Sequence, residues 1–138
     1  MSGKRIPNDF ISDMLVLMQG IKVVLLRLQQ SPANTAIANS IPSTTTTIHN
    51  ISGVYGCKHV VAFMSVIEGV LDKIRNVELG PKAELIALLL ICCDHISRML
   101  SHHVHRDDIY LGDLKKSHGL IRQLGPHFAT RIKYATSA

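Results

Sequence analysis

Apolar residues recur at spacings of three and four along almost the whole chain, and no segment alternates with a period of two. The pattern is clearest between residues 9 and 29, where Phe10, Met14, Ile21 and Leu25 share one side of a helix. A helix with one apolar side must bury that side against another helix. Because the links between the periodic segments are short, the sequence predicts an all-α fold, an up-and-down antiparallel helical bundle.

The periodic segments predict a four-helix core and a fifth, C-terminal helix. The predicted helices cover residues of about 9–29, 35–55, 58–76, 82–103 and 113–125. Gly80-Pro81 separates the third helix from the fourth, and Gly125-Pro126 is expected to end the fifth. At 138 residues the whole chain has the length of one domain.

The second helix contains residues that oppose helix formation. Pro42 lacks a backbone N–H, which costs about 3 kcal/mol inside a helix, and the threonines from Thr44 to Thr47 are stiff because they are β-branched. The sequence therefore predicts either a kink or a late helix start near Pro42.

Length and composition exclude several classes of protein. A chain of 138 residues is too short to hold this helical domain and a nucleotide-binding catalytic domain, so an autonomous enzyme is not expected. The longest apolar run, Leu85 to Cys93, is much shorter than the about 20 residues of a membrane span, and no signal-peptide core opens the chain. A cytoplasmic protein with no membrane contact is expected. Its three cysteines have no CxxC spacing and are interpreted as packing residues.

Charge and histidine content suggest neither nucleic acid nor metal as a ligand. The formal net charge of +5 could indicate an acidic partner, but the Lys and Arg residues are scattered and not interleaved with aromatic residues, so no nucleic-acid partner is expected. His102, His103 and His105, with Asp107 and Asp108, are interpreted as polar residues at a helix end because no fourth ligand stands at a typical interval. No metal and no cofactor are predicted.

The exposed side of the second helix carries the candidate chemistry. If its isoleucines face the core, Thr46, Asn50 and Gly53 lie on the opposite side and His49 lies on the flank. An exposed imidazole is a good phosphoryl acceptor because much of it is neutral and nucleophilic near pH 7. A carboxylate on the other ring nitrogen would orient the ring, and Glu68 on the third helix is the candidate. Asp94 and His95 are expected at the polar margin of the fourth helix.

A set of short motifs occurs in one order across about two-thirds of the chain. They are Asp9-Phe10, Leu26-Arg27-Leu28, Asn39-Ser40-Ile41, Gly53, Gly56, Val60 to Phe63, Glu68, Leu71-Asp72-Lys73, Leu85 to Leu90, Asp94-His95-Ile96 and Met99-Leu100. In these residues the chain resembles the amino-terminal histidine-phosphotransfer domain of CheA-type chemotaxis kinases. The resemblance implies a helical bundle whose second helix displays a phosphohistidine. It also implies two partners, a histidine kinase catalytic domain and a CheY-like response-regulator receiver domain.

The active-site motif departs from the family pattern, His-x-Ile-Lys-Gly. An ungapped register places the family's histidine on Thr46 and its lysine on His49. The supporting histidine of the next helix falls on Ser65, and the orienting glutamate falls on Glu68. A threonine hydroxyl with no adjacent base cannot replace imidazole as a rapidly reversible carrier, which leaves His49 as the candidate acceptor.

A second register pairs the family's histidine with His49 itself. It recovers the motif's glycine at Gly53, but it requires a three-residue deletion before Gly56 and puts Ser52 where lysine belongs. The ungapped register is favoured because it keeps the spacing between the first two helices.

Three hypotheses follow. The first is a phosphotransfer domain of a chemotaxis or two-component system, with His49 as phosphoacceptor, Glu68 as orienting carboxylate, and Asn50, Gly53 and Ser65 in partner docking. The second is a degenerate phosphotransfer fold that carries no phosphate and acts as a docking or dimerisation module. The third, weaker hypothesis is an unrelated helical interaction protein.

Overall fold

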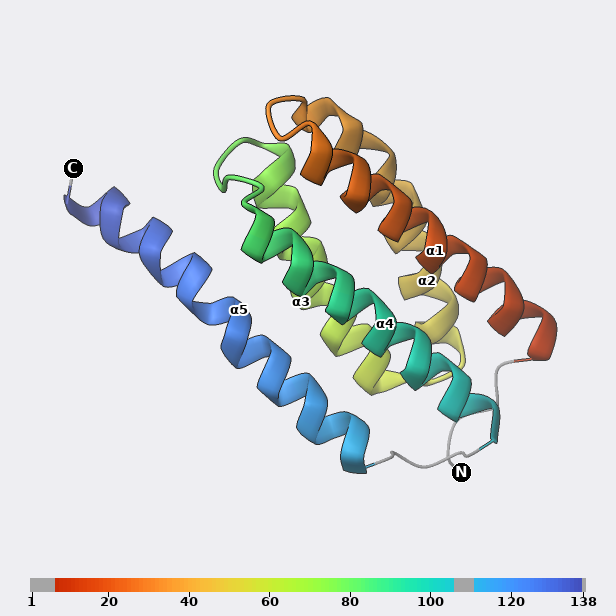
Figure 1. Ribbon diagram of the computed structural model, residues 1–138. Helices are drawn as coiled ribbons and strands as arrows, with labels where there is room; N and C mark the ends of the chain where they lie inside the picture. Colours follow the sequence, from red (N-terminus) through yellow and green to blue (C-terminus); the bar gives the residue numbers. More distant parts are fainter. Residues whose placement is uncertain (1–6, 106–110, 138) are drawn as a thin grey trace.

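The computed structural model describes residues 7–105 and 111–137, and this part of the chain is helical throughout, with no β-strand. Five α-helices and one 3-10 helix follow one another along the chain (Figure 1). The elements are α1 (Asn8–Gln30), η1 (Thr35–Ser40), α2 (Ile41–Val54), α3 (Lys58–Arg75), α4 (Ala83–His105) and α5 (Leu111–Ser137). Among the described residues, no helix is both long and apolar enough to cross a membrane.

The helices α1 to α4 surround a common apolar core. Contacts join α1 to α2 and α4, and the same two helices contact α3 on their other sides. The largest fully buried side chains come from all four helices; they are Phe63, Met14, Met18, Leu25, Leu28, Ile48, Met64, Ile67, Ile74, Leu85 and Ile86. The full sets of buried residues in α1 and α3 recur mostly at spacings of three and four, which is why the apolar periodicity of the sequence marks the core.

The segment predicted as one helix at 35–55 is divided in the structure. Residues 35–40 form the 3-10 helix η1, and the α-helix begins at Ile41, with Pro42 in its first turn. Proline is well tolerated there because the first N–H groups of a helix have no acceptor within the helix. Pro42 therefore coincides with a late helix start and does not kink the interior of α2.

Two helices of the core end in the same backbone motif. After α2, the N–H of Cys57 donates to the carbonyl of Ser52 (2.8 Å) and the N–H of Gly56 donates to the carbonyl of Gly53 (3.1 Å). The equivalent bonds after α3 run from Glu78 to Lys73 (2.8 Å) and from Val77 to Ile74 (3.1 Å). This pair of bonds is a Schellman motif, which requires a left-handed residue just beyond the helix.

The left-handed positions of the two motifs are occupied by different residue types. Gly56 has φ of 75° and Val77 has φ of 60°. Glycine adopts this conformation without steric cost, whereas a β-branched residue is strained in it.

The fifth helix is longer than predicted. The sequence suggested that Gly125-Pro126 ends a helix of residues 113–125, but α5 extends from Leu111 to Ser137 with Pro126 in its interior. Pro126 cannot donate to the carbonyl of Arg122. Both residues are exposed, so water can hydrate that carbonyl, and this lowers the cost of continuing the helix.

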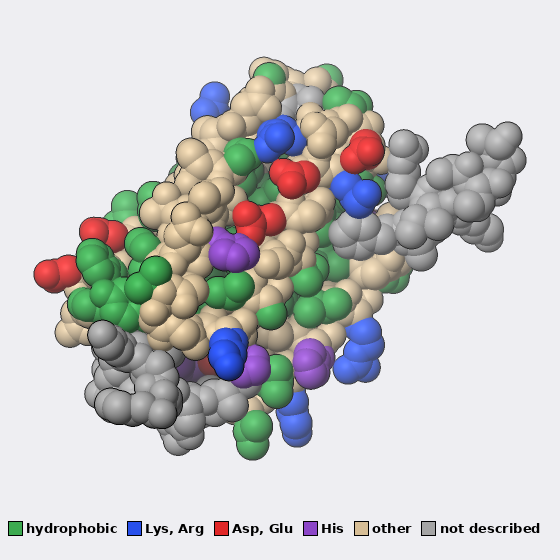
Figure 2. Space-filling model, turned by 180° about the vertical axis from the view of Figure 1, so that it is seen from behind, with side chains coloured by type: hydrophobic (Ala, Val, Ile, Leu, Met, Phe, Trp, Pro, Cys, Tyr) green, Lys and Arg blue, Asp and Glu red, His purple; other side chains and the backbone are tan. Residues whose placement is uncertain are grey.

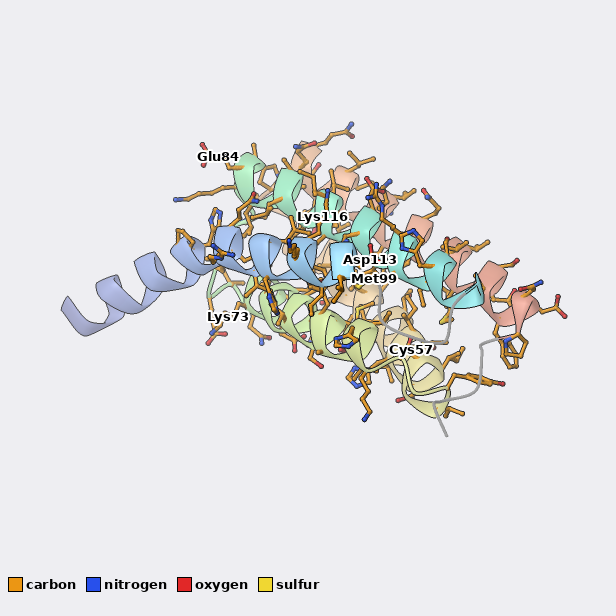
Figure 3. All side chains as sticks on the ribbon, turned by 90° about the horizontal axis from the view of Figure 1, so that it is seen from below. Cys57, Lys73, Glu84, Met99, Asp113 and Lys116 are labelled. Atoms are coloured by element: carbon orange, nitrogen blue, oxygen red, sulfur yellow. The ribbon has the colours of Figure 1, made fainter. Side chains whose placement is uncertain are left out.

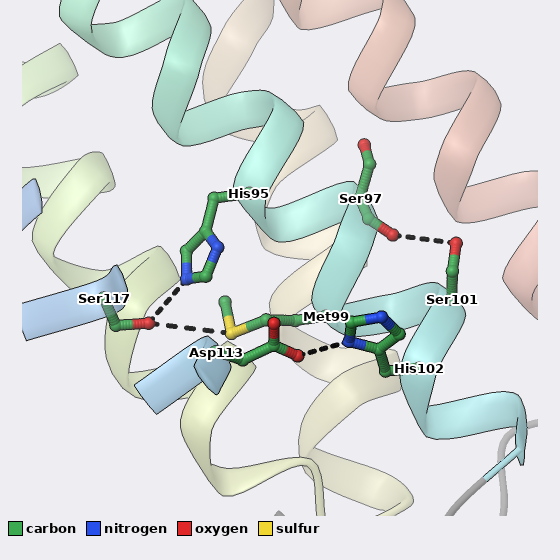
Figure 4. Close-up of polar contacts among 7 residues, drawn as sticks. All are labelled: His95, Ser97, Met99, Ser101, His102, Asp113 and Ser117. Carbon is green, nitrogen blue, oxygen red and sulfur yellow. Dashed lines mark hydrogen bonds and ion pairs between the residues drawn. The ribbon is translucent and has the colours of Figure 1, made fainter. Parts of the chain in front are cut away.

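Hydrogen bonds between polar side chains join α5 to α4, and α5 also contacts α3. Nε2 of His95 lies 2.7 Å from Oγ of Ser117, and Nδ1 of His102 lies 2.6 Å from Oδ2 of Asp113 (Figure 4). Oγ of Ser117 also contacts Sδ of Met99 at 3.7 Å. The interface between α4 and α5 is therefore partly polar, unlike the core of the four preceding helices.

The expectation that His95 lies at a polar margin was wrong. Its side chain is 2% exposed and packs edge-on against the ring of Phe63, with centroids 5.1 Å apart. Burial lowers the pKa of His95; the charge of Asp113 opposes this effect, and the charges of Lys116 and Arg98 add to it. Its Nδ1 atom has no hydrogen-bond partner among the described residues. The α5 helix covers what would otherwise be the outer side of α4, which is why His95 is buried.

Candidate functional site

Helices α2 and α3 bring His49 and Glu68 together. Nδ1 of His49 lies 2.9 Å from Oε1 of Glu68, and the two side chains are 35% and 27% exposed. The neighbour of His49 in sequence, Ile48, is fully buried and anchors this turn of α2 in the core. Buried residues thus hold the imidazole on the outer side of α2, where solvent still reaches it.

The contact with Glu68 selects one form of the imidazole. An ionised carboxylate only accepts hydrogen bonds, so Nδ1 of His49 carries the hydrogen and donates it. In the neutral ring the other nitrogen, Nε2, then holds a free lone pair. A histidine arranged in this way has a nucleophilic nitrogen and a carboxylate that stabilises positive charge on the ring.

Thr46 lies one helical turn before His49, is exposed, and lines a hollow between η1, α2 and α3. The hollow has a volume of about 170 Å³ and is lined by Ala38, Ile41, Pro42, Thr45, Thr46, Glu68, Leu71, Asp72 and Arg75. Glu68 therefore contacts His49 and also lines the hollow.

Arg75 is a site residue that the sequence analysis missed. Its Nη1 atom lies 3.4 Å from Oδ1 of Asp72, three residues earlier on α3, and both side chains line the hollow. The helical spacing of Glu68, Asp72 and Arg75 could have indicated that they share one side of α3. The packing of that side against α2 could not be read from the sequence.

The three residues predicted for partner docking are exposed around the contact between His49 and Glu68. Asn50 and Gly53 are exposed on α2 and Ser65 is exposed on α3, where its hydroxyl donates to the carbonyl of Val61 (3.0 Å). A Cβ atom added at Gly53 would meet no atom within 4 Å. On the face drawn in Figure 2, a histidine side chain lies beside an acidic one, and further acidic and basic side chains lie close to that acidic side chain.

The described residues contain no group of histidine, cysteine and acidic side chains that could hold a metal ion. Residues Asp107 and Asp108, and the side chains of His103 and His105, lie outside the described part. Burial raises the pKa of Cys57 to about 11 and the pKa values of Cys92 and Cys93 to about 12. The three thiols therefore stay protonated at neutral pH and are poor nucleophiles.

Comparisons with known proteins return no match for this chain among protein-family models, curated proteins or solved structures.

Proposed function

We propose that this protein is a histidine-phosphotransfer domain of a two-component or chemotaxis system, in which His49 carries the phosphoryl group. The observation that carries the proposal is the 2.9 Å contact between Nδ1 of His49 and Oε1 of Glu68 on a partly exposed surface of two helices. The family pattern places an orienting glutamate at Glu68, and this glutamate contacts the one histidine of α2.

The chemistry of this site is a nucleophilic displacement at phosphorus. The lone pair on Nε2 of His49 attacks the phosphoryl group of the donor, a P–N bond forms, and the bond between phosphorus and the donor's leaving atom breaks. No proton leaves Nε2, because that nitrogen is unprotonated before the attack. The Glu68 carboxylate holds the ring orientation and stabilises the positive charge that the ring gains. Transfer to a receiver domain reverses these steps with a carboxylate as the acceptor.

The proposal includes the up-and-down antiparallel order of α1 to α4. Support comes from the short connections: only residues 55–57 join α2 to α3, and residues 76–82 join α3 to α4. Short links between neighbouring helices are typical of antiparallel bundles.

The proposed partners are a histidine kinase catalytic domain and a CheY-like receiver domain, both of which must approach Nε2 of His49. Asn50, Gly53 and Ser65 are small and exposed around it, so a partner backbone could come close to the imidazole. We assign the phosphotransfer reaction to the cytoplasm, where such kinases and receivers act.

Incubation of the full chain with a CheA-type kinase core and ATP, followed by intact-mass spectrometry, tests the proposal. We expect a phosphoryl group that is lost in acid and kept in base, as a phosphoramidate is, and that is absent from His49→Ala. His59→Ala is the matched control because His59 is exposed near the start of α3 and has no place in the site. In Glu68→Gln, the rate of phosphorylation should fall by about 10²-fold, while the fraction of protein that is finally phosphorylated should stay the same. Labelling that survives in His49→Ala, or that is stable to acid, rejects His49 as the carrier.

The second candidate is a degenerate phosphotransfer fold that docks a receiver or kinase without carrying phosphate. Thr46 stands at the family's histidine position and His49 stands at its lysine position, which favours this reading. It predicts no labelling by the kinase core, together with binding that is weakened by a bulky substitution at Gly53. Gly53→Arg, measured by titration against a receiver domain, separates this candidate from an unrelated helical protein.

A further inference from the structure

The positive charge of the chain is concentrated in its last helix. The α5 sequence holds five of the 15 Lys and Arg residues but only one of the 10 acidic residues. This helix therefore accounts for four of the five net positive charges, although it is about a fifth of the chain. An uneven distribution of this kind creates a local positive potential even in a protein of modest net charge.

The one acidic residue of α5 does not offset these charges at the surface. Asp113 is 6% exposed and bonds to His102 on α4. Lys115, Lys116 and Arg122 are exposed, and none of them forms an ion pair with a carboxylate of the described residues.

Two cations of the preceding helices have carboxylate partners. Lys22 on α1 pairs with Asp94 on α4, and Arg75 pairs with Asp72 within α3. Arg27, Lys58, Lys82 and Arg98 are exposed and form no ion pair with a carboxylate of the described residues, as is also true of the described cations of α5. What sets α5 apart is its net charge, because its one acidic residue is buried.

Two of the three exposed cations, Lys115 and Arg122, occupy the side of α5 that faces away from the core. The buried residues Ser117, Leu120 and Leu124 define the inner side. At 100° per residue, Lys115 and Arg122 lie nearly opposite that side, seven residues or about 10 Å apart along the axis. Lys116 lies along the edge of α5 next to α4 (Figure 3), where Arg98 of α4 is also exposed.

We propose that the outer side of α5, with Lys115 and Arg122, and the adjoining edge, with Lys116, form a binding surface for an acidic segment of a partner protein. Charge complementarity identifies the occupant, because this surface offers cations without internal partners over the length of two helical turns. An acidic helix with carboxylates at the same seven-residue spacing matches Lys115 and Arg122.

Other polyanions fit this surface less well. A membrane-binding helix directs a row of large apolar side chains outward. The outer side of α5 between Lys115 and Arg122 offers His118 and Gly119, and the two exposed large apolar side chains of α5, Leu111 and Ile121, are ten residues apart and form no such row. A nucleic-acid surface needs a longer track of cations than the two helical turns between Lys115 and Arg122.

Fluorescence anisotropy of a labelled oligoglutamate peptide with the full chain tests the proposal. The variant is Lys115→Glu/Arg122→Glu, and its matched control is Lys58→Glu/Lys82→Glu, which changes net charge equally at exposed lysines outside α5. We expect the α5 variant to bind at least tenfold more weakly and the control to stay within about twofold of the wild type. Raising the salt concentration from about 50 to 200 mM should weaken wild-type binding.

Three outcomes would overturn the proposal. The first is equal weakening by both double variants, which would show an effect of overall charge. The second is failure of the wild type to bind the peptide at low salt. The third is tighter binding of duplex DNA or of phosphatidylserine vesicles than of the peptide. The neutral variant Lys115→Gln/Arg122→Gln, with its helical content checked by circular dichroism, provides the same comparison without introducing new carboxylates.

Discussion

Replacing Val77 by glycine is expected to stabilise the protein. Val77 follows α3 with φ of 60°, a left-handed conformation that costs a non-glycine residue about 1–3 kcal/mol. Its side chain is 74% exposed, so removing it sacrifices only a few tenths of a kcal/mol of apolar burial. Glycine also makes the unfolded chain more flexible, which costs about 0.4–1 kcal/mol. The balance for Val77→Gly is a gain of about 0.5–1 kcal/mol in the free energy of unfolding.

Gly56 provides a matched reversal of the same change. It occupies the same position of the Schellman motif after α2, with φ of 75°. Gly56→Val introduces the strain that Val77→Gly removes, and we expect it to lower the free energy of unfolding by about 1 kcal/mol or more. Val77→Ala should fall between the wild type and Val77→Gly, because alanine keeps a Cβ atom but loses the branching.

Urea unfolding followed by circular dichroism measures these differences, with thermal unfolding as a second readout. A gain of 1 kcal/mol corresponds to a rise of about 2–8 °C in Tm for a domain of this size. If Val77→Gly lowers the unfolding midpoint, as a glycine in an ordinary exposed loop does, the strain argument is refuted. If both substitutions change stability in the same direction, the two motifs are not equivalent.

Two further predictions concern the buried His95 and two exposed glycines. The pKa of His95 is lowered from 6.5 by burial, so the unfolded chain takes up the proton first and stability should fall as the pH drops below about 6.5. His95→Leu should reduce that slope when urea midpoints are compared at about pH 7.5 and 5.5; an unchanged slope would assign the dependence to other groups. Gly20 and Gly69 are exposed inside α1 and α3 with no atom within 4 Å of an added Cβ, so alanine at either position should add about 1 kcal/mol of stability. Gly69 adjoins Glu68, whereas Gly20 lies on α1 outside the site. Only Gly69→Ala should therefore change the rate of phosphoryl transfer at His49. An equal effect of both substitutions on that rate would argue against partner docking at this surface.

The candidate site could be predicted in part. Glu68 was a candidate partner for His49, supported by its match to the orienting glutamate of the family pattern, and the structure places the two side chains in contact. The hollow beside them was not expected, because it depends on how closely η1 and α2 approach α3. Arg75 was missed for the same reason. Helical spacing predicts on which side of α3 a residue lies, but it does not predict which other helix packs against that side.

The α4–α5 contact shows a second limit of sequence reasoning. His95 follows Asp94 and is itself polar, which led to the prediction of a polar margin, although its spacing from Leu88, Cys92 and Met99 places it on the apolar side of α4. The His95 ring contacts Phe63 of α3 and Ser117 of α5, and Ser117 reaches α4 only because α5 packs there. The interpretation of Pro126 as a helix end was wrong for a related reason. A proline in the sequence indicates that continuing the helix is costly, but it does not show which contacts or solvation of the folded protein offset that cost.

The sequence by itself determined the helical class, the number of α-helices and the side of each core helix that is buried, because apolar residues at spacings of three and four make any other secondary structure unfavourable. It indicated that Pro42 disturbs the second helix but left open a kink or a late start, and the structure places Pro42 in the first turn of α2. Only the tertiary structure decided that His49 meets Glu68, that His95 is buried and that Lys115 and Arg122 face solvent. These properties depend on contacts between helices, whose geometry follows from the packing of the whole core and from no local segment.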